Sequence, residues 1–174
     1  VKDFGSELRN RIYDVGVRTL ELCIHDHYED CPFREQGLYT MDSRNQMLCG
    51  YYAFKEYDFP RACIKLMAED NRPDGMLSIT YPGASGLVIP SFGLHFYTAV
   101  REYGDYSGDW SFVEEIFPKL LSITDAFIRH YNESEGLLYN FGDSCYWNFY
   151  EWAKGLEGTI GTVTEERADL IINT

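Results

Sequence analysis

Apolar side chains recur at helical spacing along most of the chain, and this periodicity is the strongest constraint on the fold. Near the N-terminus, five side chains follow the i, i+3, i+4 rule and form one apolar stripe on a helix expected over residues 6–24. The stripe consists of Leu8, Ile12, Val15, Thr19 and Leu22. Four more helices are expected over residues 42–56, 58–70, 90–103 and 110–131. Helices of this length, joined by turns and irregular loops, are typical of stacked helical hairpins and predict an all-α fold.

Breakers and caps predict where these elements end. Asp58-Phe59-Pro60 and Pro90 are expected to start helices, because proline is favoured at a first helical position. A long irregular loop is expected over residues 76–89, and a short strand over 137–141. The second helix is expected to bury Met47, Leu48, Tyr51 and Phe54. A last helix is expected to begin at Thr164, ten residues before the end, so residues 1–174 are interpreted as a single partial domain.

The charge of the chain excludes one class of partner. There are 28 acidic against 15 basic residues, a net charge of −13 that repels phosphate backbones, so nucleic acid is not an expected partner. Because no window of 18 apolar residues exists, no membrane partner is expected either. The chain is expected to be soluble, and its compartment stays open between cytoplasmic, periplasmic and secreted. Five cysteines without CxxC spacing predict buried free thiols.

Carboxylates are densest between residues 26 and 42, where five of them accompany an arginine. A solvated loop is the simplest explanation of such a cluster. A metal site of His25 and His27 with Asp26 or Glu29 is the second, although i and i+2 side chains diverge on a helix. Glycoside hydrolysis is the third, because it needs one protonated carboxyl and one carboxylate beside aromatic platforms.

The string Asp30-Cys31-Pro32-Phe33-Arg34-Glu35, followed by Asp42, resembles the signature of bacterial α-L-rhamnosidases of glycoside hydrolase family 78. Weaker similarity runs through most of the chain. It covers Asp74-Gly75, Ile89 to Phe92, Tyr106 to Asp109 and Trp147 to Trp152. The resemblance implies a catalytic domain built as an (α/α)6 barrel of six helical hairpins, of which residues 1–174 would be an N-terminal portion.

The resemblance also implies roles for individual residues. Glu35 would be the general acid that protonates the glycosidic oxygen, and Arg34 would contact an acid or the substrate. Tyr39 stands where the family usually has tryptophan, so it would stack on the sugar. Trp147 and Trp152 would also stack on the sugar, with core packing as their alternative. The residues expected to bind the sugar are therefore Asp30, Arg34, Tyr39, Asp42, Trp147 and Trp152.

The family inverts the anomeric configuration, and the resemblance implies that its catalytic base comes from later sequence. The isolated chain is therefore expected to be inactive, and its exposed helix faces to bind the remaining chain or another copy. No metal or cofactor is expected; the expected partner is a rhamnose-containing carbohydrate. Two alternatives stay open: a six-hairpin glycosidase for another sugar, and a non-catalytic carbohydrate-binding or scaffold domain. Catalysis requires Glu35 to enter a cleft beside Asp30 and Asp42, whereas a scaffold leaves these carboxylates splayed.

Overall fold

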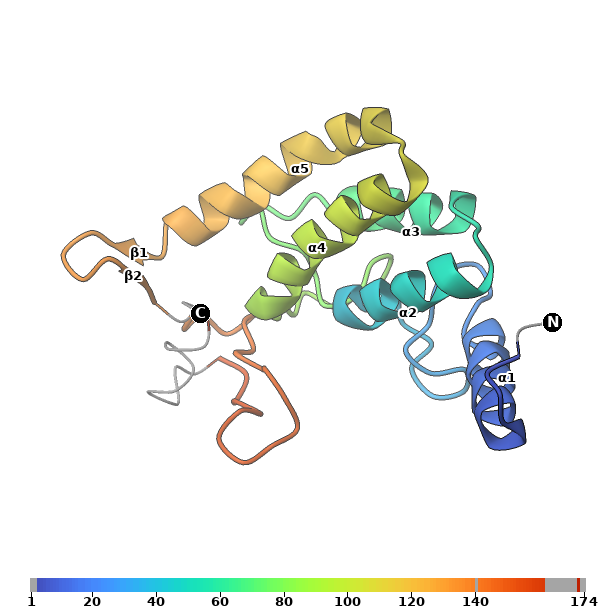
Figure 1. Ribbon diagram of the computed structural model, residues 1–174. Helices are drawn as coiled ribbons and strands as arrows, with labels where there is room; N and C mark the ends of the chain where they lie inside the picture. The colour runs from blue at the N-terminus through green and yellow to red at the C-terminus, as the bar shows by residue number, and fades with distance from the viewer. Residues whose placement is uncertain (1–2, 140, 162–171, 173–174) are drawn as a thin grey trace.

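The computed structural model describes residues 3–139, 141–161 and 172, and helices dominate this part of the chain (Figure 1). The helices are α1 Glu7–Leu22, α2 Thr40–Ala53, α3 Asp58–Ala68, α4 Pro90–Ser107 and α5 Trp110–Ile128. The strands β1 Tyr131–Asn132 and β2 Leu137–Leu138 pair antiparallel, with Tyr131 opposite Leu138. The all-α prediction is confirmed, and the expected strand is present but only two residues long. The helix expected to begin at Thr164 lies outside the described residues.

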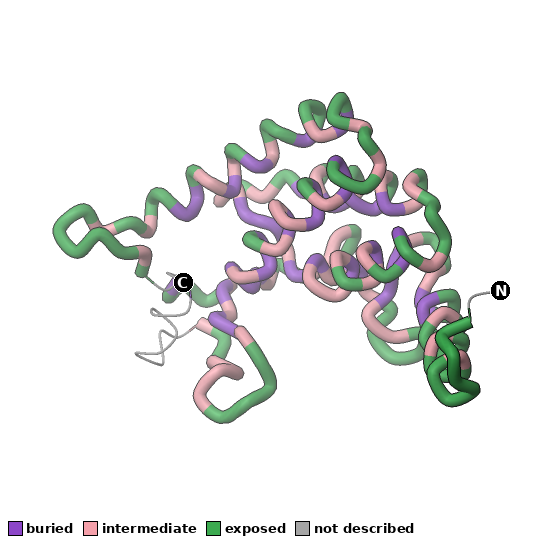
Figure 2. The backbone as a smooth tube through the Cα atoms, viewed as in Figure 1, coloured by how far each residue is buried: buried purple, intermediate pink, exposed green. Residues whose placement is uncertain are grey.

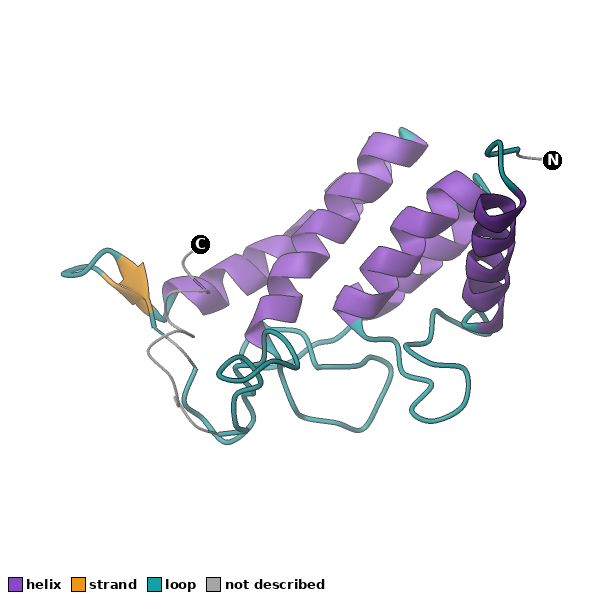
Figure 3. Cartoon of the chain, turned by 60° about the horizontal axis from the view of Figure 1, so that its bottom comes forward, coloured by secondary structure: helices purple, strands orange, loops and turns teal. Residues whose placement is uncertain are grey.

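Helix α4 is central: it packs against α2, α3 and α5, while α1 packs against α2 at one side. Long loops precede α2 and α4, and Figure 3 shows them gathered at one end of the helices. An isolated bridge between Tyr39 and Thr80 joins these two loops, and one between Val88 and Tyr146 joins the loop before α4 to the segment after β2. Segments far apart in sequence therefore meet at the N-terminal ends of α2 and α4.

Local signals account for most of the helix boundaries. Ser6 caps α1 by accepting a hydrogen bond from the backbone N–H of Arg9 at 3.2 Å. Pro90 begins α4, and Gly108 ends it in the left-handed conformation with φ of 77°. Helix α2 begins two residues earlier than expected, at Thr40. Asp42 therefore lies in the first turn of α2, where the helix dipole favours negative charge.

The core lies between α2, α3, α4 and α5, where Ile64, Phe96 and Ile123 are fully buried (Figure 2). Helix α2 buries Met47 and Tyr51 as expected. Its expected fourth core residue, Phe54, is 37% exposed, because it stands at the C-terminal cap of the helix.

The apolar stripe of α1 is the main difference from the expected burial. Leu8 and Ile12 are 70% and 63% exposed, and Leu20 is the buried residue of the helix. Periodicity identified the helix correctly, but none of the described elements covers the stripe. Whether a further segment or a second copy binds there stays a prediction.

The five cysteines differ in how far they are buried. All five cysteines are free, as expected, but Cys49 is exposed, which contradicts the prediction that all are buried.

No helix within residues 3–139, 141–161 and 172 combines the length and apolarity needed to cross a lipid bilayer.

Candidate active site

A short closed loop presents the first carboxylate of the site. The backbone N–H of Asp30 donates to the Gly37 carbonyl at 3.1 Å, and the Gly37 N–H donates to Asp30 Oδ1 at 2.8 Å. These two bonds join the ends of an eight-residue segment that carries Glu35. The Asp30 carboxylate therefore has one oxygen bound to the backbone, and its Oδ2 accepts no hydrogen bond from the residues that the structure describes.

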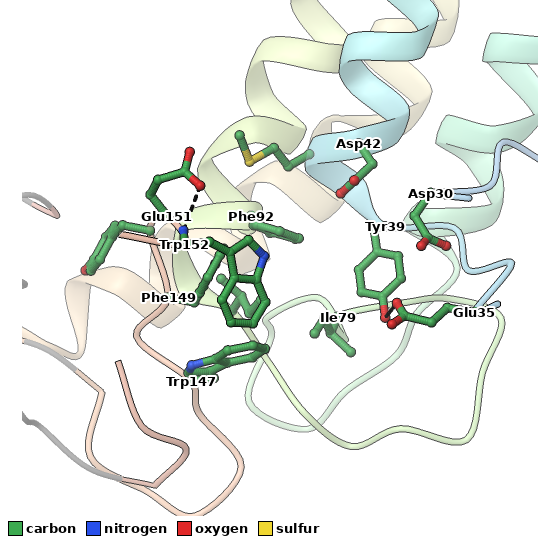
Figure 4. A pocket seen from close by; sticks show the side chains of 13 residues that line it. Asp30, Glu35, Tyr39, Asp42, Ile79, Phe92, Trp147, Phe149, Glu151 and Trp152 are labelled. Atoms are coloured by element: carbon green, nitrogen blue, oxygen red, sulfur yellow. Dashed lines mark hydrogen bonds between the residues drawn. The ribbon is translucent and has the colours of Figure 1, made fainter. Parts of the chain in front are cut away.

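A pocket of about 550 Å³ opens beside this loop (Figure 4). Asp30, Glu35 and Asp42 line one side, and the rings of Trp147 and Trp152 line the opposite side. The remaining lining residues are Tyr39, Met41, Ile79, Ile89, Phe92, Phe149, Tyr150 and Glu151. Of these, Ile79, Ile89, Phe92 and Phe149 form a small buried cluster of their own. The pocket is thus acidic on one side, aromatic on the other and held in place by an apolar base.

Asp42 is a pocket carboxyl whose pKa is shifted by its surroundings. Burial raises the pKa of Asp42 above its ordinary value, and the nearby negative charges of Asp30 and Glu35 raise it further. Its own backbone N–H opposes this shift by donating to the carboxylate. No lysine, arginine or histidine is among the described residues that line the pocket, so no basic side chain there offsets the repulsion.

Replacing Asp42 by asparagine is therefore expected to stabilise the fold at neutral pH. Because the pKa of Asp42 is raised in the folded state, the carboxyl favours folding below its unfolded value of 3.8 and loses that contribution as pH rises through the raised pKa. The midpoint of thermal unfolding should be higher for Asp42→Asn at pH 7, and the gain should disappear near pH 3. Asp14→Asn, an exposed change on α1, is the control; an equal gain in the control would contradict the explanation.

Tyr39 contacts Glu35 directly. Its hydroxyl donates a hydrogen bond to Glu35 Oε2 at 2.8 Å. Burial raises the pKa of the Tyr39 hydroxyl, and the hydrogen bond and charge of Glu35 raise it further. The phenol therefore stays protonated at any working pH and remains a donor.

The aromatic side of the pocket comes from residues 147–152. Trp152 is 75% exposed, so its core-packing alternative is wrong. Its ring centroid lies 4.8 Å from that of Phe149 and 5.8 Å from that of Trp147. The indole N–H of Trp147 donates to the Glu157 carbonyl at 2.7 Å, and this bond links the aromatic side of the pocket to the rest of its loop. This loop needs Gly158, since a Cβ there would collide with the carbonyl oxygen of Asn148.

Arg34 and the two histidines of the metal-site alternative are not among the residues that line the pocket. Arg34 is exposed and is not among the lining residues, so its substrate contact stays a prediction. His25 Nδ1 lies 3.0 Å from Glu29 Oε2, and His27 Nδ1 lies 2.8 Å from the carbonyl oxygen of Tyr28. Across the described ranges, no group of three histidine, cysteine or acidic side chains has a metal-binding arrangement.

Sequence reasoning missed Glu151, a fourth carboxylate of the pocket on its aromatic side (Figure 4). Its Oε1 accepts a hydrogen bond from the backbone N–H of Trp152 at 2.6 Å. Its position between two stacking candidates could have suggested it. The apolar base formed by Ile79, Ile89 and Phe92 had no comparable signal, because these residues look like ordinary core in the sequence.

Known proteins of one family are similar to this chain. A family model described as the bacterial alpha-L-rhamnosidase 6 hairpin glycosidase domain matches residues 5–168. No curated protein matches the chain. A crystal structure of a family 78 rhamnosidase of Bacillus sp. GL1 is similar with a TM-score of 0.82 and 28% identity, over 97% of this chain and 17% of that one.

A rhamnosidase from Klebsiella oxytoca with rhamnose bound is similar with a TM-score of 0.74 and 26% identity. That match covers 88% of this chain and 31% of the other, so this chain spans less than a third of either structure. This chain belongs to the bacterial α-L-rhamnosidase six-hairpin glycosidase domain family.

Proposed function

We propose that residues 1–174 form the proton-donating part of the active site of an inverting α-L-rhamnosidase, with Glu35 as the general acid. The observation that carries the proposal is the meeting of Asp30, Glu35 and Asp42 in one pocket opposite Trp147 and Trp152. A scaffold domain with surface charge would leave these carboxylates apart.

In the proposed reaction, Glu35 transfers a proton to the glycosidic oxygen as the bond between this oxygen and the anomeric carbon breaks. The sugar then carries oxocarbenium-like positive charge, which the neighbouring carboxylates of Asp30 and Asp42 stabilise. In the ground state the same two carboxylates accept hydrogen bonds from sugar hydroxyls. Trp147 and Trp152 offer apolar faces to the C–H groups of the ring. In this proposal the acids act from one side of the pocket and the two tryptophan rings from the opposite side.

Inversion requires a second carboxylate that activates water on the opposite face of the sugar. We propose that it comes from outside residues 1–174, as the family resemblance implies. Glu151 shares the pocket, but its Oε1 is bound to the backbone of its own loop. The isolated chain is then expected to bind sugar without turnover.

The test is hydrolysis of a panel of aryl glycosides by the protein that carries this chain. Release of phenol from the α-L-rhamnoside, with proton NMR showing the β-anomer of rhamnose first, is the expected result. Matched α-L-mannosides and α-L-arabinosides should be poor substrates. Preference for another sugar would move the protein to a different specificity on the same fold. Initial release of the α-anomer would refute the inverting mechanism.

A further inference from the structure

We infer that Tyr39 is a positioning residue for the general acid: its hydroxyl holds Oε2 of Glu35 and leaves Oε1 to carry the transferred proton. The inference rests on the proposed function and adds a role that sugar stacking does not supply. The geometric basis is the 2.8 Å hydrogen bond from the Tyr39 hydroxyl to Glu35 Oε2.

The backbone of Tyr39 is held on both sides of the residue. Tyr39 is the N-terminal cap residue of α2, and its carbonyl accepts from the N–H of Ser43 at 2.9 Å. It also pairs with Thr80 of the loop before α4 through an isolated bridge. The hydroxyl of Tyr39 therefore projects from a fixed point at the junction of two loops.

The ring of Tyr39 lies against Gly37, and this contact requires a residue without a side chain. A Cβ on Gly37 would lie 2.8 Å from Cε2 of Tyr39 and 2.9 Å from Cγ2 of Thr80. Both distances are below ordinary van der Waals contact, so a larger residue would push the ring or the loop. Gly37 thus leaves the space that lets the phenol reach Glu35.

The direction of the hydrogen bond decides which oxygen of Glu35 can act. A neutral carboxyl carries its proton on one oxygen, and its carbonyl oxygen is the better acceptor, so the bond from Tyr39 to Oε2 favours the proton on Oε1. The proton then resides on Oε1. When it leaves for the glycosidic oxygen, both oxygens gain negative charge, and the bond from Tyr39 becomes charge-assisted and stronger. Tyr39 therefore favours the state that follows proton transfer.

The Tyr39 hydroxyl is a hydrogen-bond donor to Glu35 in a pocket that is also lined by other carboxylates. Asp30 comes from the same loop, Asp42 from the first turn of α2 and Glu151 from the aromatic side of the pocket. The like charges of Asp42 and Glu35 repel each other. Among the pocket residues that the structure describes there is no basic side chain, so the Tyr39 hydroxyl is a neutral means of stabilising the developing carboxylate.

The experiment compares Tyr39→Phe with the unchanged protein that carries this chain, on two α-L-rhamnosides with different leaving groups. Hydrolysis of an alkyl rhamnoside needs the general acid, whereas the dinitrophenolate group of a dinitrophenyl rhamnoside leaves without protonation. We expect kcat to fall about tenfold on the alkyl substrate and less than about twofold on the aryl one, with KM little changed on both.

Tyr97→Phe is the matched control, since it removes a hydroxyl that donates to the Leu120 carbonyl at 2.7 Å, away from the pocket. Its effect should be equal on both substrates. Equal losses on both substrates for Tyr39→Phe, or no loss, would overturn the inference. If Tyr39→Phe does not fold, Gly37→Ala carries the same test through displacement of the ring. Because Glu35→Gln is measured beside them, an active Glu35→Gln rejects the proposed function, whereas an inactive one with unselective Tyr39→Phe rejects only the role of Tyr39.

Discussion

Glu35→Gln in the protein that carries this chain is expected to lower kcat on an alkyl α-L-rhamnoside by roughly 10²- to 10⁴-fold, the range for removal of a general acid. Glutamine has nearly the same shape, and its amide oxygen can still accept the hydrogen bond from Tyr39. It has no proton that it can transfer to a leaving oxygen. Substrate binding should therefore be largely preserved, which calorimetry with the inactive variant would show.

Two matched variants make this result interpretable. Glu114→Gln, at an exposed position on α5, should leave turnover unchanged. Glu151→Gln examines the other carboxylate on the aromatic side of the pocket. Its turnover should stay within about tenfold of the unchanged protein if the catalytic base lies outside this chain. A loss as large as that of Glu35→Gln would place the base within residues 1–174, and near-normal turnover by Glu35→Gln would reject Glu35 as the acid.

The positions of the helices could be predicted from local sequence pattern, whereas the burial of their apolar side chains could not. Pro90 and Ser6 stand where their backbone chemistry requires, and both mark true helix starts. The stripe containing Leu8 and Ile12 has the right period but lies exposed. Periodicity reports which residues share a face of a helix; what covers this face depends on other segments. Burial of an outer helix is therefore a property of the assembly, and local sequence cannot supply it.

The acidic side of the pocket could be predicted because it is local in sequence. Asp30, Glu35 and Asp42 lie within 13 positions, and one closed loop with the first turn of α2 brings them together. The opposite wall depends on long-range pairing, such as the bridge between Val88 and Tyr146. Resemblance supplied the tryptophans of that wall, and only the position of Glu151 between them in the sequence pointed to the fourth carboxylate. The Tyr39–Glu35 bond likewise depends on the exact path of the loop.

Phe96→Ala is expected to destabilise the described fold by about 3–5 kcal/mol, the usual cost of emptying a large aromatic site in a core. Phe96 is fully buried on α4, the helix that packs against α2, α3 and α5. Because typical domains have only about 5–15 kcal/mol of stability, this single cavity would remove a large share of it. Urea unfolding of the 174-residue chain, followed by circular dichroism, measures the change.

The consequence for the site follows from where α4 begins. Phe92, one turn before Phe96, belongs to the apolar base of the pocket, and α2 beside it carries Asp42. Loss of Phe96 should therefore loosen the acidic side relative to the aromatic side before the chain unfolds completely. Phe117→Ala is the matched control, since Phe117 on α5 is 52% exposed and its removal should cost less than about 1 kcal/mol. Equal costs for the two variants would show that α4 does not form the core on which the pocket is built.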